Sequence, residues 1–440
     1  MSMKEVLVLG GGLSGLSAGY QLSKGGFKVR ILEKNRTPGG LSRGFQVGNT
    51  WLDVYYRHIF ASNRNFLNLV DELGLKEKLI WKKTKLGVFY ENKIYELSPM
   101  NLLLDFQPLG LADKIKFGLS VLKILLKEDW KDLDNITTKE WVIENCGKRV
   151  YDVMFAPLLE EKWGDSAEKI SAAWFWGRMK PRIQTRTSGM LSEKLGYMEG
   201  SFKTLIEKIV RKIKNLNGTI ETSSEVKEIS VKNNFVKRVV YKKDGKTKET
   251  KPDIVISTLP IPAFLKMFSD LDSSYKNKLE KIKYKSVVCS IIGMKKKLSD
   301  IYWLNVCSEL PFGGVIEHTN FIEPKFYGNQ NIVYLFNYTD TWNRKWKLSD
   351  KSLIEEYSTG LKEIFPSFSG DLINWFRVFR DAYATPVYER NYSKYMPDYR
   401  SPFENLYLTG IFLTYPLNRN MDTAIKAGND VVRRILNDLW

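Results

Sequence analysis

The sequence predicts an α/β fold, and three patterns in its 440 residues lead to this prediction. A short apolar run at 5–9 is followed at once by a glycine-rich turn, which is typical of a buried parallel strand that leads into a helix. A long stretch from Lys93 to about Arg186 is mostly helical in pattern. A separate antiparallel sheet is predicted from segments that alternate or are rich in β-forming residues, near 86–96, 285–297, 312–319 and 331–338.

The glycine-rich turn fits the pattern GxGxxG at 10–15. Gly10 allows the tight turn, Gly12 lets a diphosphate approach the backbone, and Gly15 lets the following helix pack closely on the sheet. The free N–H groups at the start of that helix can bind phosphate. A second predicted strand ends at Glu33, whose carboxylate can accept hydrogen bonds from a ribose diol. The pattern predicts a Rossmann-type dinucleotide-binding domain, and alone it does not distinguish NAD from FAD.

Composition excludes several classes of protein. The hydrophobic fraction is 43% and the charged fraction 27%, which excludes a mainly disordered chain and a polytopic membrane protein. The three cysteines lack metal-ligand or CxxC spacing, so no metal is predicted, and a reducing compartment is the simplest interpretation. The start of the chain has the marks of a strand and turn, not of a signal peptide.

The net charge of +18 is the one unusual feature of the composition. It is compatible with an anionic substrate, an anionic lipid surface, nucleic acid or simple solubility. Because the lysines are spread along the chain and no nucleic-acid-binding signature occurs, no nucleic-acid partner is predicted.

The segment after Glu33 carries a resemblance to a known family. It resembles the paired-glycine segment of the flavin-containing amine oxidase superfamily, which includes protoporphyrinogen oxidase and phytoene desaturase. The residues concerned are Arg36, Pro38, Gly39, Gly40, Leu41, Ser42 and Arg43. The resemblance implies that FAD is the cofactor and that this segment wraps its diphosphate. Gly48 and Asp53 resemble the stretch of that family that lies beside the flavin ring, although the bulky 54–56 replaces its usual small residues.

Three later segments extend the resemblance over most of the chain. Residues 155–175 resemble a segment of protoporphyrinogen oxidase-like proteins, and Val226 matches a valine whose backbone meets adenine in the family. Residues 405–436 resemble the C-terminal strand, loop and helix, with Gly410 at the end of the strand. The resemblance implies that the helix N-terminus faces the flavin, although Asp422 could equally be an ordinary helix-start residue.

The glycine pattern and the resemblance together predict a set of FAD-binding residues: Gly10, Gly12, Leu13, Ser14, Gly15, Glu33, Lys34, Gly39, Gly40, Leu41, Ser42, Val226, Gly410, Asn420 and Met421. They also divide the chain. We expect a discontinuous FAD-binding domain at 1–80, 190–270 and 395–440. The inserted substrate-binding sheet is expected at 81–98 and 271–394, and the helical subdomain at 99–189.

Catalytic residues are harder to predict, because in a flavin enzyme the cofactor does the chemistry. His58 and His318 are the two histidines, and either could shuttle a proton or be a satisfied structural residue. Arg57 could meet FAD or substrate. Tyr388 resembles a family segment that closes the substrate cavity. The predicted catalytic residues are therefore His58, Arg57 and Tyr388.

Two basic segments offer contacts for a substrate or a membrane. The first contains Trp174, Trp176, Arg178, Lys180, Arg182 and Arg186. It could bind a carboxylate or phosphate of a substrate, or be a solvated helix end. The second, 114–127, is a basic amphipathic stretch, and packing against the chain's own core is preferred over docking on a membrane surface. The predicted partner is a small molecule, either anionic or lipid-soluble, and the protein is expected to be cytoplasmic, with peripheral membrane contact as the alternative.

The predicted function is that of an FAD-dependent oxidoreductase that moves a hydride from a C–N or C–C bond to flavin N5. The main alternative rests on a looser resemblance of 57–60, 314–321 and 421–425 to UDP-galactopyranose mutase, in which the flavin acts on a nucleotide sugar without net redox. A flavin-binding scaffold without turnover is a third hypothesis.

Overall fold

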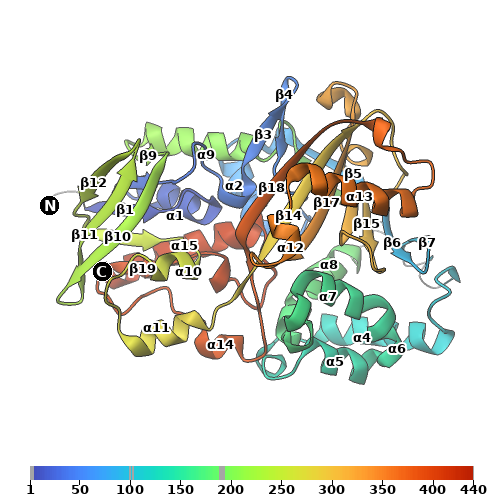
Figure 1. Cartoon of the computed structure of the whole chain (residues 1–440). Coiled ribbons are helices and arrows are strands. Elements are labelled where there is room, and N and C mark those ends of the chain that lie inside the picture. Colours follow the sequence, from blue (N-terminus) through green and yellow to red (C-terminus); the bar gives the residue numbers. More distant parts are fainter. Residues whose placement is uncertain (1–3, 99–100, 102–103, 188–193, 440) are drawn as a thin grey trace.

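The computed structural model describes residues 4–98, 101, 104–187 and 194–439. It confirms the α/β fold with several sheets (Figure 1). A five-stranded parallel sheet and a seven-stranded, mostly antiparallel sheet lie side by side, and helices α4 to α8 gather below the larger sheet in this view. The proposed domain boundaries stay a prediction.

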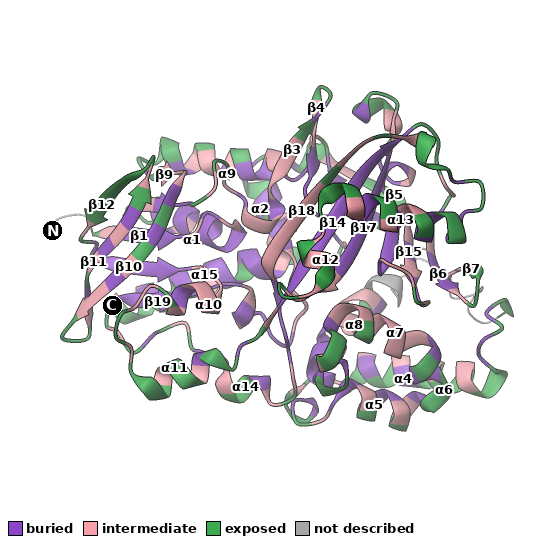
Figure 2. Cartoon of the chain, in the orientation of Figure 1, coloured by how far each residue is buried: buried purple, intermediate pink, exposed green. Residues whose placement is uncertain are grey.

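The parallel sheet has the strand order β19-β13-β1-β2-β9. Its strands are β1 (Glu5–Leu9), β2 (Lys28–Leu32), β9 (Thr219–Glu221), β13 (Ile254–Ser257) and β19 (Leu406–Leu408). The apolar sequence of β1 fits its central position, because a parallel strand covered on both faces must be apolar throughout. Figure 2 shows this region as buried.

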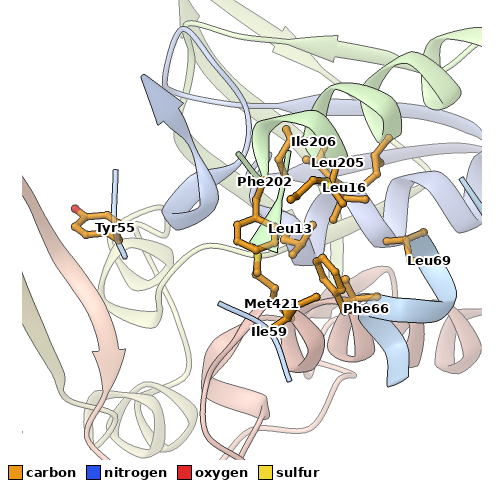
Figure 3. Close-up of a cluster of buried hydrophobic side chains, with 14 of the residues drawn as sticks. Leu13, Leu16, Tyr55, Ile59, Phe66, Leu69, Phe202, Leu205, Ile206 and Met421 are labelled. Atoms are coloured by element: carbon orange, nitrogen blue, oxygen red, sulfur yellow. The ribbon is translucent and has the colours of Figure 1, made fainter. Parts of the chain in front are cut away.

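Four helices cover this sheet: α1 (Leu13–Lys24), α2 (Arg64–Glu72), α9 (Lys203–Asn215) and α15 (Met421–Leu439). Their apolar faces meet in one cluster, in which Leu13, Phe66, Phe202 and Met421 are all buried (Figure 3). A Cβ added at Gly428 of α15 would lie 2.4 Å from the carbonyl oxygen of Ser14, so the first and last helices touch backbone to backbone. This contact joins the first turn of α1 to the third turn of α15.

A three-stranded meander leads back into the parallel sheet. It consists of β10 (Ser224–Lys232), β11 (Phe235–Lys243) and β12 (Lys246–Thr250). Asn233 and Asn234 have φ of 53° and 54°, and Asp244 and Gly245 have φ of 48° and 81°. Positive φ at both central residues suits a tight hairpin turn.

The larger sheet has the order β18-β14-β17-β16-β15-β6-β7. Its strands are β6 (Leu86–Tyr90), β7 (Lys93–Glu96), β14 (Tyr284–Met294), β15 (Trp303–Val306), β16 (Gly314–Glu317), β17 (Asn331–Thr339) and β18 (Ile373–Pro386). Two small sheets pair β3 (Gly44–Val47) with β4 (Thr50–Asp53) and β5 (Leu79–Lys83) with β8 (Lys194–Met198). Helices α12 (Arg344–Lys347) and α13 (Asp350–Ile364) lie over the seven-stranded sheet.

The helical region contains α4 (Leu111–Leu126), α5 (Thr138–Cys146), α6 (Lys148–Val150), α7 (Ala156–Trp163) and α8 (Ala172–Thr187). Three short helices lie elsewhere, α10 (Ile261–Leu265), α11 (Ser273–Glu280) and α14 (Tyr392–Tyr395). Among the described residues, no helix has the length and apolar character to cross a membrane.

The orientation of α4 corrects one expectation. The preferred interpretation, in which its apolar stripe packs on the core, is wrong. Ile115, Leu119, Leu122 and Leu126 are 54%, 56%, 53% and 81% exposed. The helix instead buries Ser120 and Ile124. Amphipathic spacing shows that one face is apolar, but it does not show that this face meets the core.

Candidate functional site

An elongated cavity follows the carboxyl ends of the parallel strands, and it contains the predicted FAD-binding residues. Gly10, Gly12, Leu13, Ser14, Glu33, Lys34, Gly39, Gly40, Leu41, Ser42, Val226, Gly410, Asn420 and Met421 all line it. Gly15 does not. A Cβ at Gly15 would lie 2.1 Å from the carbonyl oxygen of Gly10, so this glycine permits the close packing of α1 on β1. We call this space the cofactor cavity.

The glycine loop leaves room where a diphosphate would approach. Gly12 has a β-region backbone, and the nearest heavy atom to an added Cβ is the Cα of Gly40, 4.0 Å away. Gly10 has a φ of +105°, which favours glycine, and a Cβ there would meet the Oγ1 of Thr258 at 2.4 Å. Packing therefore does not explain why residue 12 is glycine. The open space fits a ligand that must come close to the backbone at the start of α1.

Glu33 closes one end of the cofactor cavity. Its side chain is 4% exposed, and its Oε2 accepts a hydrogen bond of 2.8 Å from the backbone N–H of Gly11. Its Oε1 accepts from the backbone and side-chain nitrogens of Asn35, at 2.8 and 2.6 Å. These bonds fix the carboxylate in place. Each oxygen has two lone pairs, so Oε2 keeps capacity for a ribose hydroxyl.

The start of α15 closes the other end. Asn420 caps this helix, because its Oδ1 accepts from the N–H of Thr423 while the Thr423 hydroxyl accepts from the N–H of Asn420. Asp422 accepts hydrogen bonds from the N–H of Phe66 and the side chain of Asn65, at 2.9 and 3.1 Å. Asp422 thus ties α15 to the first turn of α2, which is a structural role that the sequence could not separate from a flavin contact.

A second cavity, of about 370 Å³, adjoins the first. We call it the substrate cavity. Its walls come from the loop at 55–63, from α7, α8, β15 and β17, and from the loop before α15. Both cavities share Leu41, Arg57, Arg419, Asn420 and Met421. A ligand in the substrate cavity therefore lies directly against the α15 end of the cofactor cavity.

Positive charge gathers around the substrate cavity. Arg57, Lys162, Arg178, Arg182 and Arg419 line it. Burial, with the neighbouring Arg178, Arg419 and Arg182, holds the pKa of Lys162 well below its usual range. Burial also lowers the pKa of Arg57 to about 10, although the nearby Asp53 carboxyl opposes this. The cavity is thus cationic.

Glu161 also lines the substrate cavity, on the same turn of α7 as Lys162. One of its carboxyl oxygens accepts a 3.2 Å hydrogen bond from the N–H of Tyr338. Burial raises its pKa to about 8, which the bond from Tyr338 and the charge of Lys345 only partly offset. The carboxyl therefore holds a proton near neutral pH. Both Glu161 and Lys162 lie in the segment that the sequence singled out by resemblance, but nothing in that pattern pointed to either as a site residue.

His58, one of the predicted catalytic residues, lines the substrate cavity. Its Nδ1 lies 3.2 Å from the hydroxyl of Tyr302, and its ring packs against Phe60 and Trp303. Burial and the charges of Arg182 and Arg178 lower its pKa to about 3. The imidazole is therefore neutral at physiological pH and can exchange hydrogen bonds without carrying charge.

Arg57 sits between the two cavities and lines both of them. Its guanidinium donates a hydrogen bond to the carbonyl oxygen of Leu41. Its Nε is buried and, in the described part of the chain, has no hydrogen-bond partner. An unpaired buried donor costs free energy, so its position is better explained by a ligand than by the fold.

Tyr388 and His318 lie outside both sets of lining residues. Tyr388 is fully buried, and its hydroxyl donates to the carbonyl oxygen of Ile411 at 2.8 Å. Because Ile411 lines the cofactor cavity, Tyr388 can act on the site only through that contact. His318 is 2% exposed and lies 2.7 Å from the hydroxyl of Tyr327. Its environment is that of a satisfied structural histidine.

The basic and aromatic segment on α8 divides between two environments. Arg178 and Arg182, four residues apart, line the substrate cavity, whereas Trp174 and Trp176 are buried. Lys180 donates to the carbonyl oxygen of Lys127. The side chain of Arg186 lies outside the described residues. Asp53, expected beside the flavin, lines neither cavity and is held by Tyr197 and Phe202 at 2.5 and 3.3 Å.

The model of the flavin-containing amine oxidoreductase family matches residues 13–436. The chain belongs to this family. Its cofactor is FAD, and it is an FAD-dependent oxidoreductase. The glycine loop, Glu33 and the start of α15 all line the cofactor cavity.

Curated and solved relatives share this architecture. The chain is similar to a 15-cis-phytoene desaturase of Glycine max, with 23% identity over 99% of this chain and 80% of that protein. A crystal structure assigned to a protoporphyrinogen oxidase of Exiguobacterium sp. 255-15 matches with a TM-score of 0.76 and 16% identity, over 100% and 99% of the two chains. Reduced UDP-galactopyranose mutase matches with a TM-score of 0.75 and 17% identity, over 99% and 96%. At these identities the structural matches show the fold alone.

Proposed function

We propose that the protein oxidises a C–N or C–C bond of a small-molecule substrate that binds in the substrate cavity. This proposal rests on the wall that the substrate cavity shares with the cofactor cavity. Leu41, Arg57, Arg419, Asn420 and Met421 line both cavities, so a bound substrate lies against one end of the cofactor cavity. FAD, when bound, supplies a two-electron acceptor at flavin N5 for a hydride taken from a substrate C–H bond, while the proton of the neighbouring N–H or C–H leaves to a base or to water.

The chain's own residues would bind and orient the substrate. His58, neutral and aimed at the cavity, offers a hydrogen bond without charge. Glu161 can hold or release a proton at a pH close to 8. Aromatic walls from Tyr56, Trp303 and Phe336 would exclude water from the reacting bond. Tyr388 is a positioning residue in this scheme, since its hydroxyl holds the backbone at Ile411.

The test is an anaerobic half-reaction with the oxidised holoenzyme. The purified protein should be yellow and carry about one FAD per chain. Fractions of a small-molecule extract are added without oxygen, and the oxidised flavin spectrum is followed. We expect at least one fraction to bleach it, with a substrate oxidised by two electrons. A colourless protein that binds no added FAD would refute the proposal.

The cationic cavity also favours a second candidate, a mutase-like reaction on a nucleotide sugar without net redox. The same experiment separates the two. A mutase-like enzyme would show no substrate-dependent bleaching and would convert a UDP-sugar only after the flavin had been reduced. If the UDP-sugar is converted only when the flavin is reduced, the mutase-like reaction becomes the preferred function.

We also place the protein in the cytoplasm with a peripheral contact to an anionic membrane surface. The support is the exposed stripe on α4, where Ile115, Leu119, Leu122 and Leu126 share one outward face. Lys116 and Lys123 are exposed on the same helix. An amphipathic helix with lysines beside an outward apolar stripe has the composition of an interfacial helix. The net charge of +18 adds attraction to anionic lipid.

A further inference from the structure

Lys162, Arg178 and Arg419 converge on one side of the substrate cavity. None of the ion pairs in the described part of the chain includes any of the three. Arg419 donates one hydrogen bond, of 2.8 Å, to the hydroxyl of Tyr338. Its Nε is buried and has no partner among the described residues. These three side chains form what we call the cation cluster.

Aromatic rings hold the cluster in place. The Nζ of Lys162 lies 4.8 Å from the ring centroids of both Trp163 and Trp174, and 5.8 Å from that of Tyr338. The guanidinium carbon of Arg178 lies 5.7 Å from the Trp174 ring. Cation–π contacts of this kind are worth roughly 0.5–2 kcal/mol each and orient a cation without neutralising it. The charges are therefore fixed and still uncompensated.

The carboxyl groups nearby do not balance them. Glu161 lines the same cavity, but burial raises its pKa to about 8, so it is mostly protonated at neutral pH. Asp422 also lines this cavity, but its carboxylate is turned to Phe66 and Asn65 at the start of α2, and no ion pair in the described part of the chain joins it to any of the three cations. Burial lowers the pKa of Lys162 most, and repulsion from Arg178 and Arg419 lowers it further, because like charges that share a space repel one another. Such an arrangement persists where a ligand supplies the missing negative charge.

FAD would not supply it. Lys162 and Arg178 line only the substrate cavity. The diphosphate of FAD would lie at the start of α1, by Gly12, which lines the cofactor cavity but not the substrate cavity. Only Arg419 of the cluster is shared with the cofactor cavity. The cluster is thus available to the substrate.

We propose that the cation cluster of Lys162, Arg178 and Arg419 binds a phosphate or diphosphate group carried by the substrate. This inference rests on the proposed function, since it names the substrate class of the same cavity. Two planar guanidinium groups suit bidentate contact with phosphate oxygens, and the lysine adds a point charge. A bound anion raises the pKa of Lys162 and favours its charged form, so a group with two or more negative charges suits this cluster better than a single carboxylate. The reacting C–H bond would then lie on the Arg57 side of the cavity, toward Asn420 and Met421.

The experiment titrates the oxidised holoenzyme with inorganic diphosphate at low, constant ionic strength, with calorimetry as the readout. FAD content is read first from the absorbance spectrum, so loss of the cofactor and loss of anion binding are separate results. We expect saturable binding of about one diphosphate per chain. Lys162→Gln and Arg178→Gln should each weaken it about 10- to 100-fold, because each removes one charge-assisted contact.

Matched controls are Lys169→Gln and Arg211→Gln, which remove equal charges from exposed positions outside the cavity. Both should bind diphosphate as the wild type does. Arg178→Lys should recover part of the affinity, which a variant damaged in folding would not do. Absence of saturable binding by an FAD-loaded wild type overturns the proposal, as does equal affinity of Lys162→Gln and Lys169→Gln. Tighter binding of succinate than of diphosphate overturns the phosphate assignment.

Discussion

The substitution Gly12→Asp separates the cofactor role of the glycine loop from its packing role. The Gly12 Cβ position is open, with its nearest heavy atom 4.0 Å away, so a Cβ can be added there without a clash. It would place a carboxylate where the FAD diphosphate approaches α1. Two like charges about 4 Å apart repel by about 4 kcal/mol at an effective dielectric constant of 20. We therefore expect FAD affinity to fall about 1,000-fold.

The assay is a titration of apoprotein with FAD, followed by flavin fluorescence, beside thermal unfolding of each apoprotein. Gly12→Ala is the uncharged control, and we expect it to lose much less affinity than Gly12→Asp. Gly15→Ala is the packing control. Its Cβ would lie 2.1 Å from the carbonyl oxygen of Gly10, so it should destabilise the apoprotein by about 1–3 kcal/mol.

Two results would refute this reasoning. If Gly12→Asp binds FAD as tightly as the wild type, the diphosphate does not lie at the start of α1. If the Gly12→Asp apoprotein unfolds at as low a temperature as the Gly15→Ala apoprotein, position 12 requires glycine for packing and not for a ligand.

Three further predictions follow from groups described above. Glu161→Gln should remove an ionisation near pH 8 from the pH profile of flavin reduction, and a profile identical to that of the wild type would exclude a proton role for this carboxyl. The double variant Leu119→Ser, Leu122→Ser should cosediment several-fold less with anionic lipid vesicles. Its free energy of unfolding should change by under about 0.5 kcal/mol. The control Leu216→Ser, on another exposed surface, should bind vesicles as the wild type does. Burial raises the pKa of Asp53 to about 7, above its unfolded value of 3.8, so the folded state holds this proton more tightly and stability should fall as pH rises from about 4 to 7. Asp53→Asn should remove that part of the pH dependence of chemical unfolding, and an unchanged dependence would show that another group causes it.

Local sequence patterns were sufficient to predict most of the residues that line the cofactor cavity at its glycine loop and at Glu33. The turn at Gly10 and Gly12, the helix after it and the position of Glu33 lie within one β–α–β unit, where spacing dictates geometry. Hydrogen-bond partners were not predictable in the same way. Asp422 could be assigned only once α2 and α15 were placed together, because its partner Phe66 is 356 residues away.

The substrate half depends on packing between distant segments, and the sequence showed less of it. Arg178 was noticed because it belongs to a visible basic cluster. Lys162 and Glu161 were not predicted as site residues, because a single Glu-Lys pair on a helix is usually exposed to solvent. They line a cavity because α7 packs on β17, where Tyr338 meets both side chains. No periodicity in the sequence reports that contact.

The contact between the first and last helices has a consequence for how the protein is made. Gly12 and Met421 lie on the walls of one cavity, about 400 residues apart in the chain. At about 5–20 residues per second, synthesis separates their emergence by roughly 20 to 80 s. During that interval the glycine loop has no α15 against it, and the cavity wall formed by Arg419, Asn420, Met421 and Ala424 is missing. FAD capture is therefore a late event in biogenesis, and a nascent chain cut short before α15 would fold parts of both sheets yet remain colourless.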